Sequence, residues 1–253
     1  MNSMNDDGTD FRRRPVSFVR RSARLSTGQQ RAWDNYSGRF LIDIPRGRAD
    51  TSVDPGYVLD PAVVFGREAP LVVEVGSGAG EAVIHAAARH PDVNFLAIEV
   101  YTPGLAQTLM QIGRQELTNV RLIQANAPEM LTTALPAASV RELWVFFPDP
   151  WHKNRHHKRR LVSPHFASLA ARVLEPAGLW RLATDWAGYA RVMRNAVDAS
   201  DEFTNLHPGP GTGAVPAGGW APRFEGRVMT SFEKKALDAG RTVHDLTYRR
   251  KPD

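Results

Sequence analysis

Cysteine is absent from the 253 residues, and this absence excludes several kinds of chemistry at once. Disulfides, zinc sites with thiolate ligands, iron–sulfur clusters and a cysteine nucleophile all require that side chain. The sequence also lacks any apolar run that approaches the roughly 20 residues needed to cross a bilayer. Its N-terminus is acidic and then arginine-rich, without the apolar core of a secretory signal. We therefore expect a cytoplasmic protein with no membrane partner.

Positive charge is in modest excess and is unevenly distributed. The 32 Lys and Arg residues outnumber the 27 Asp and Glu residues, which gives a net charge of +5 and favours a polyanionic partner. Six arginines and no acidic residue lie between positions 11 and 24. Because residues 1–50 show no sustained periodicity, we predict a flexible basic arm there, with one short helix at 29–36. A single domain is predicted over 51–253, and its segment 207–223, with five glycines and four prolines, is expected to be a flexible surface loop.

From residue 70 onward, short apolar runs alternate with helical patterns, which is typical of a parallel sheet flanked by helices. Strands are predicted at 71–75, 94–98, 120–124, 143–147 and 179–183, and helices at 80–90, 103–117, 164–174 and 186–199. Ser163 before Pro164 fits a helix N-cap followed by proline at the first helical position. Residues 176–178, Pro-Ala-Gly, predict a turn from helix to strand. A further helix at 230–239 and a strand at 242–249 complete a doubly wound α/β domain.

Three glycines follow the first predicted strand, in the segment Glu74-Val75-Gly76-Ser77-Gly78-Ala79-Gly80. Residues without side chains allow a ligand to approach the backbone where a helix begins. A dinucleotide fingerprint would require glycine at position 81, which is Glu81. The observed spacing, with an acid two residues before the first glycine, suits a cofactor that carries an ammonium group and no phosphate. A tight turn from strand to helix is the plain alternative.

Polar residues also close the next two predicted strands. Glu99 ends the second strand, where a carboxylate can accept hydrogen bonds from both hydroxyls of a ribose. Asn126 follows the third strand, where its amide can pair with the edge of an adenine. Taken singly, Glu99 is also explained as a solvated strand end and Asn126 as a turn residue. Polar groups at three successive strand ends together favour a cofactor site.

A basic segment follows the fourth predicted strand. The ten residues from Trp151 to Arg160 include five Lys or Arg, three histidines, one aromatic residue and no acid. This composition indicates an electropositive surface that stacks on nucleic acid, although a solvated charged face is the ordinary alternative. The histidines do not predict a metal site, because no matching ligand cluster occurs elsewhere in the sequence. The whole run reads Phe146-Phe147-Pro148-Asp149-Pro150-Trp151-His152-Lys153-Asn154-Arg155-His156-His157-Lys158-Arg159-Arg160.

With this run, the sequence resembles the tRNA (guanine-N7-)-methyltransferase family of bacterial type. Agreement extends to the arginine-rich residues 17–21, to 74–80, to 183–186 and to 230–233, and it covers nearly the whole chain after residue 15. The resemblance implies a class I, Rossmann-like, S-adenosylmethionine-dependent methyltransferase fold. Its sheet is seven-stranded and mostly parallel, flanked by helices, with the last strands partly antiparallel. The implied reaction is tRNA modification, namely methylation of N7 of a variable-loop guanosine, at position 46 of tRNA.

The resemblance also implies roles for individual residues. The S-adenosyl-L-methionine site would be lined by Glu74, Gly76, Gly78, Gly80, Glu99, Asn126 and Asp149. Substrate would be bound by Lys153, Asp185, Thr230, Ser231, Phe232 and Glu233, and RNA by Arg155, His156, His157, Lys158, Arg159 and Arg160. Asn126 stands where many members have aspartate, and Ser231 where many have lysine or asparagine. Helix N-capping remains an alternative for Asp185, as does a capping box for residues 230–233.

Asp149 is the predicted catalytic residue. Guanine N7 carries an available lone pair, so methyl transfer needs in-line approach and exclusion of water but no strong base. Asp149 is expected to orient the guanine by accepting from its N1–H and amino group, and to favour the cationic purine that forms. Shaping an Asp-Pro turn is the alternative role.

Two rival functions differ from this one. The first is methylation of another RNA or of a small molecule. The arginine-rich segments disfavour the small molecule, because a substrate other than RNA would not need them. A non-catalytic RNA-binding protein on the same scaffold is disfavoured by the intact Glu74, glycines and Asp149. The sequence predicts tRNA as partner and no metal, and does not distinguish a monomer from a homodimer.

Overall fold

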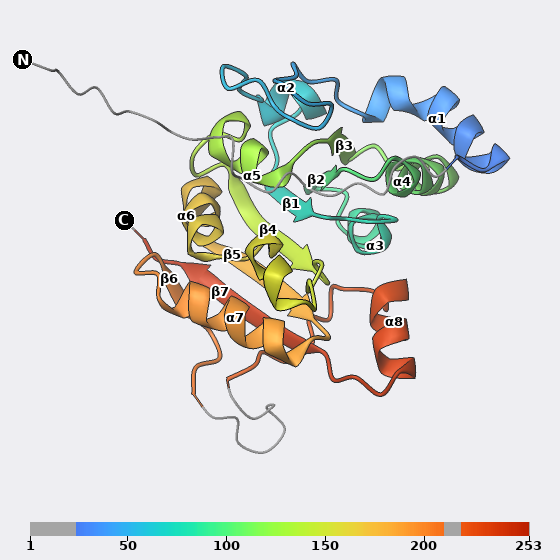
Figure 1. Ribbon diagram of the computed structural model, residues 1–253. Helices are drawn as coiled ribbons and strands as arrows, with labels where there is room; N and C mark the ends of the chain where they lie inside the picture. The colour runs from blue at the N-terminus through green and yellow to red at the C-terminus, as the bar shows by residue number, and fades with distance from the viewer. Residues whose placement is uncertain (1–23, 210–218, 253) are drawn as a thin grey trace, which may run out of the picture.

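The computed structural model describes residues 24–209 and 219–252. Seven strands form one sheet in the order β3-β2-β1-β4-β5-β7-β6 (Figure 1). The first five strands are parallel, and β7 runs antiparallel to both β5 and β6. The predicted seven-stranded, mostly parallel sheet is thus confirmed. The strand bounds are β1 Leu71–Val75, β2 Asn94–Glu99, β3 Val120–Gln124, β4 Val140–Phe146, β5 Leu174–Thr184, β6 Phe203–Asn205 and β7 His244–Arg250.

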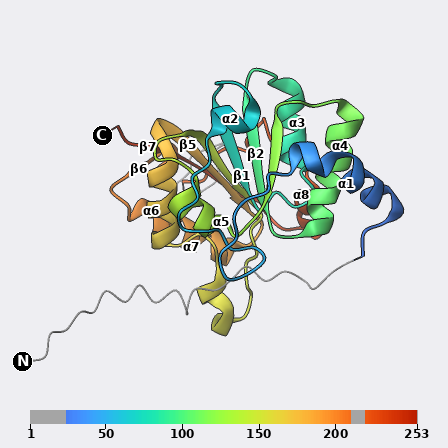
Figure 2. The ribbon, with the colours of Figure 1, turned by 90° about the horizontal axis from the view of Figure 1, so that it is seen from above.

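Helices cover both faces of the sheet (Figure 2). One face carries α1 (Thr27–Phe40), α3 (Glu81–Arg89), α4 (Thr102–Gln115) and α8 (Ser231–Asp238). The other carries α2 (Pro61–Phe65), α5 (Ala127–Glu129), the π-helical turn η2 (Met130–Ala134), α6 (Pro164–Val173) and α7 (Ala187–Asp198). Every residue of β1 and β2 is buried, because side chains on both faces of these strands lie under helices. The short 3-10 helix η3 (Asn154–Arg159) projects from the sheet, in yellow at the bottom of Figure 2.

Two predicted strands have different starting points in the structure. β4 begins at Val140 and ends at Phe146, so Phe147 lies outside it, with φ at +52°. β5 begins at Leu174 and continues through the residues predicted as a turn, so that prediction is wrong. β5 can begin this early because its register with β4 is irregular: Val140 pairs with Leu174, but Glu142 pairs with Leu179. The extra residues bulge out, with Ala177 at φ +64°, and the strand then resumes.

The first helix, α1, is longer than predicted and packs on the domain. Ser26 and Gln29 form a reciprocal capping box at its start. Tyr36 lies directly over Gly113 of α4, and Phe40 is buried. Residues 1–23 of the predicted basic arm, with five of the six arginines between positions 11 and 24, lie outside the described residues. The domain boundary at residue 50 stays a prediction.

The end of the Gly/Pro-rich segment is not at the surface. Trp220 and Ala221, which fall in the predicted surface loop, are 8% and 3% exposed. Ala221 forms a bridge to Asp245 of β7, and the Trp220 ring lies 4.8 Å from that of His244. The prediction of a surface loop is therefore wrong for Trp220 and Ala221, because the His244 ring and the edge of β7 bury them. Residues 210–218 lie outside the described part of the chain.

A buried ionic cluster fixes α8 to the sheet. The Arg227 guanidinium is fully buried and donates to Asp245 of β7 at 2.5 Å and to Glu233 of α8 at 3.1 Å. Arg223 donates to the same Glu233 carboxylate at 2.7 Å. Although burial opposes it, hydrogen bonds from Arg223 and Arg227 hold the pKa of Glu233 below its ordinary value. The guanidinium also lies 5.1 Å and 5.4 Å from the rings of Phe146 and Phe147 at the end of β4.

We expect Arg227→Met to lower the free energy of unfolding by about 3–5 kcal/mol, because two desolvated carboxylates lose their shared partner. Chemical denaturation measures this change. Lys234→Met is the control, since its ion pair with Asp238 is exposed and contributes at most about 0.5 kcal/mol. Equal stability of the Arg227 variant and the control would contradict the importance of the cluster.

Candidate active site

Carboxylates converge at the carboxyl ends of the central strands. Glu74 lies on β1 and Glu99 ends β2, and they are 4% and 9% exposed. Glu99 accepts hydrogen bonds from the backbone N–H groups of Gly78, Val100 and Tyr101 at 2.8, 2.6 and 2.9 Å. Asp149 follows β4 and is exposed, yet its charge contributes to raising the pKa of Glu99. Glu99 therefore lies near both Glu74 and Asp149, two other acids predicted to belong to the site.

The buried acids have raised pKa values. Burial is the main cause of the shift that raises the pKa of Glu74 to about 8, and the charges of Glu99 and Glu81 add to it. Burial likewise raises the pKa of Glu99, although its three backbone donors oppose the shift. Ionised carboxylates in this environment are stabilised by a positive charge placed among them. The site consequently favours a cationic ligand.

The three glycines of the loop between β1 and α3 have left-handed backbone conformations. The φ angles of Gly76, Gly78 and Gly80 are +71°, +56° and +74°, a region that glycine adopts without steric cost. At Gly80 an added Cβ would also lie 2.4 Å from the Thr108 hydroxyl. The turn geometry by itself explains why glycine is needed at each position. Contact of these glycines with a cofactor remains a prediction.

Sequence reasoning missed Gly104, which supports this loop from α4. A Cβ at Gly104 would lie 2.3 Å from the carbonyl oxygen of Gly78. The approach is so close that only glycine allows α4 and the loop to keep their present positions. In the sequence, Gly104 is one residue in the first turn of an expected helix, and nothing there signals the contact.

Two buried polar atoms in the described structure lack a hydrogen-bond partner at this edge of the sheet. They are Asn126 Oδ1, whose side-chain amide donates to Glu129 at 3.1 Å, and Ser77 Oγ. Both residues are less than one-tenth exposed. An unsatisfied buried polar atom costs about 1–3 kcal/mol, so a ligand that hydrogen-bonds here would be stabilised. Asn126 was predicted as a site residue, whereas Ser77 was not.

The start of α8 lies against the glycine loop. Ser231 donates from its backbone N–H and its hydroxyl to Glu81 at 2.8 and 2.9 Å. Phe232 comes within 3.5 Å of a Cβ built on Gly78. A pocket of about 20 Å³ lies between the start of α8 and the glycine loop. Thr230 caps the helix by accepting from the Glu233 N–H, as the capping-box alternative predicts. The Glu233 carboxylate instead binds Arg223 and Arg227, away from the loop.

The segment after β4 encloses a hollow of about 280 Å³. Its lining residues are Asp149, Pro150, Trp151, His152, Lys153 and His156. Trp151 has φ at +46°, and the Arg159 guanidinium lies 5.0 Å from its ring. Desolvation and the neighbouring cations hold the pKa of His156 below its ordinary value. The hollow thus brings together the predicted catalytic acid Asp149, the predicted substrate residue Lys153 and one predicted RNA contact, His156.

Arg160 differs from the other cations of this segment. Its Nε donates to the carbonyl of Pro150 at 2.8 Å, and its guanidinium lies 4.9 Å from the ring of Tyr189. The Tyr189 hydroxyl accepts in turn from the Val162 N–H at 3.0 Å. Arg160 therefore closes the segment onto α7, whereas Lys153, Arg155 and Lys158 are exposed. An RNA contact of Arg160 remains a prediction.

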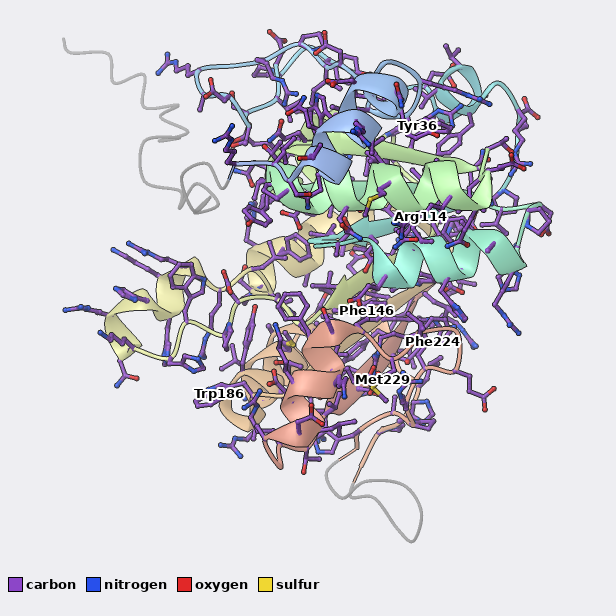
Figure 3. The ribbon with its side chains drawn as sticks, turned by 90° about the vertical axis from the view of Figure 1, so that its right-hand side faces the viewer. Tyr36, Arg114, Phe146, Trp186, Phe224 and Met229 are labelled. Carbon is purple, nitrogen blue, oxygen red and sulfur yellow. The ribbon has the colours of Figure 1, made fainter. Side chains whose placement is uncertain are left out.

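Asp185 follows β5 and does not cap α7. The residue at the N-cap position is Trp186, so the capping alternative for Asp185 is wrong. Its carboxylate accepts from Arg241 at 2.7 Å. The neighbouring Trp186 ring contacts that of His152, with centroids 4.2 Å apart, so the segments after β4 and β5 touch. Figure 3 shows Trp186 on the side of the molecule from which η3 projects.

Over residues 24–209 and 219–252, no group of three or more histidine, aspartate or glutamate side chains could hold a metal ion. Across the same residues, no helix has the length and apolar character that a membrane span requires.

Comparison with known proteins points to one enzyme family. Residues 68–246 match a family described as putative methyltransferases. A protein of Arthrobacter sp. (strain FB24) named tRNA (guanine-N(7)-)-methyltransferase is 51% identical, over 94% of this chain and 86% of its own length. One of the same name from Cutibacterium acnes is 46% identical, over 96% and 86%. Among solved structures, the 16S rRNA methyltransferase KamB has a TM-score of 0.52 at 16% identity, covering 74% of this chain and 91% of its own.

We expect Gly104→Ala to weaken binding of S-adenosylmethionine, the ligand that the resemblance implies, because the new methyl group displaces the Gly78 carbonyl. Overpacking of this kind costs about 1–3 kcal/mol, which corresponds to a loss of affinity of about 5- to 150-fold. Isothermal titration calorimetry measures it. Gly38→Ala on α1 is the control, because no described atom lies within 4 Å of its new Cβ. Unchanged affinity in Gly104→Ala would show that the loop is not held by this contact.

Proposed function

Because the chain belongs to the tRNA (guanine-N7-)-methyltransferase family, we propose that it transfers a methyl group from S-adenosylmethionine to N7 of a guanosine in tRNA. The membership confirms the resemblance predicted from residues 146–160. Neither rival function, methylation of another substrate or RNA binding without catalysis, is that of the two sequence relatives described above, which are named tRNA (guanine-N(7)-)-methyltransferase. KamB, at 16% identity, shares the fold alone. The target nucleoside, position 46 in the variable loop, is part of the proposal.

The observation that carries the proposal is the group of acids at the strand ends. S-adenosylmethionine, when bound, supplies a methyl group on a cationic sulfonium, and its amino acid part carries an ammonium. Glu74 would hold the ammonium, Glu99 the ribose hydroxyls and Asn126 the adenine edge. The raised pKa values of the two glutamates and the unpartnered Asn126 Oδ1 and Ser77 Oγ support this assignment.

Guanine would enter the hollow beside Asp149. The exposed Asp149 carboxylate is reached from solvent, and it accepts hydrogen bonds from the N1–H and amino group of the base. Held in this way, N7 can approach the methyl carbon in line without deprotonation. The negative charge of Asp149 then stabilises the purine as it becomes cationic.

The tRNA would be held by the outer part of the same segment. Lys153, Arg155 and Lys158 are exposed on or beside η3, where they can contact phosphates. The substrate roles of Asp185 and of residues 230–233 follow from the family resemblance. Of these, Thr230, Ser231 and Phe232 lie beside the glycine loop, which suits a part in closing the site over its ligands.

Incubation with labelled S-adenosylmethionine and unmodified tRNA tests the function. We expect 7-methylguanosine in the variable loop, located by borohydride and aniline cleavage. Asp149→Ala is expected to lower kcat by about a hundredfold or more, since it removes a group that stabilises developing charge. Asp92→Ala, an exposed acid in the turn between α3 and β2, is the control. Label in another nucleoside would refute the reaction, and full activity of Asp149→Ala would refute that residue's role.

Binding of S-adenosylmethionine should depend on pH through Glu74. With a pKa of about 8, this carboxyl is protonated at lower pH, whereas the cationic ligand binds its ionised form. Affinity should therefore rise with pH, by at most about tenfold per unit, and level off above pH 8. Calorimetry at constant ionic strength measures the slope. Glu74→Gln removes the titrating group, so an unchanged slope in that variant would contradict the assignment.

A further inference from the structure

We propose that Trp186 is a stacking surface for a nucleobase of the RNA substrate, next to the hollow that contains Asp149. The inference rests on the proposed function, because it takes the ligand of the hollow to be a guanine within an RNA chain. It adds a binding residue, since Trp186 lies outside the set of residues to which substrate or RNA contacts were assigned above.

The local fold does not require tryptophan at this position. Trp186 occupies the N-cap of α7, where serine, threonine, aspartate or asparagine normally supplies a side-chain oxygen. In the described structure it makes no side-chain capping bond, and its backbone N–H binds the Thr184 hydroxyl at 3.3 Å. Trp186 is 37% exposed, whereas Trp144, Trp180 and Trp220 are all buried. Its apolar surface is thus available at the edge of the site.

His152 places the indole next to the hollow. The two rings meet at 69° with centroids 4.2 Å apart, in a T-shaped contact. His152 also lines the hollow together with Asp149. A base that stacks on the exposed surface of Trp186 would therefore lie beside a guanine bound at Asp149.

The chemistry of the surroundings identifies the partner as RNA. A guanine that enters the hollow loses stacking with its neighbours in the chain, and enzymes that act on single bases meet this cost by supplying other stacking partners. Tryptophan stacks on any base, so it can receive the nucleotide adjacent to the target. Lys153 and Arg155 are exposed nearby and can bind the phosphates on either side. An aromatic ring flanked by cations is the arrangement that binds single-stranded nucleic acid.

Trp186→Leu tests the proposal, because leucine is apolar but has no ring. Stacking on one aromatic side chain corresponds to about 5- to 150-fold in affinity, so the Kd for tRNA should rise within that range. Trp186→Phe keeps a ring and should retain most of the affinity. Val192→Ala on the same helix is the control, because Val192 is 39% exposed. The Kd for S-adenosylmethionine and the thermal midpoint should stay the same in all three variants.

The salt dependence of tRNA binding separates stacking from phosphate contact. Loss of a stacked base leaves the slope of log affinity against log salt unchanged, whereas Arg155→Gln should reduce it by about one. Wild-type affinity in Trp186→Leu, a reduced salt slope in that variant, or an equal loss in Trp186→Phe would each overturn the proposal. If the wild-type protein bound tRNA through Trp186 but formed no 7-methylguanosine, the stacking surface would stand and the proposed reaction would fail.

Discussion

The buried guanidinium of Arg227 joins the parts of the site that the sheet alone does not hold. A fully desolvated cation is tolerated only where paired carboxylates surround it, and here Glu233 comes from α8 and Asp245 from β7. The same guanidinium lies against the rings of Phe146 and Phe147, three and two residues before Asp149. The position of α8 over the glycine loop and the direction in which the chain leaves β4 are thereby coupled. A family motif residue such as Glu233 can be essential through this coupling without touching substrate.

Charge is arranged in two zones around the reaction centre. The inner zone is acidic, with Glu74 and Glu99 buried and Asp149 close enough to affect Glu99. The charge of Arg227 lowers the pKa of Glu74, but Arg227 donates its hydrogen bonds to Glu233 and Asp245. Burial therefore keeps the pKa of Glu74 raised. The outer zone is basic, along the segment that contains η3. An acidic interior suits a cationic methyl donor, and a basic exterior suits a polyanionic RNA, so the two substrates are distinguished by where each sign of charge lies.

The sequence was sufficient to predict the central sheet, because buried parallel strands carry apolar runs, such as residues 95–98 of β2. Glu99 and Asn126 could be found for the same reason, since a polar residue that ends such a run lies at the edge where ligands bind. The bulge in β5 and the burial of Trp220 could not be predicted, because the first depends on the pairing with β4 and the second on the His244 ring. Gly104 and Arg227 could not be predicted either. Gly104 matters through its approach to the Gly78 carbonyl, and Arg227 through carboxylates on two other elements, α8 and β7.

The cations of the basic segment differ in the contacts that they already make within the protein. In the sequence, Arg155 to Arg160 form one cluster, but the structure divides them by what each side chain already binds. Arg160 donates to the Pro150 carbonyl and stacks on Tyr189, so its guanidinium holds the turn that carries Asp149. Arg159 lies over the Trp151 ring in the same segment. A cation engaged in this way must give up existing contacts before it can bind a phosphate, whereas Lys158 is exposed and has less to lose. We therefore expect RNA affinity and turnover to depend on different residues of this one contiguous basic run.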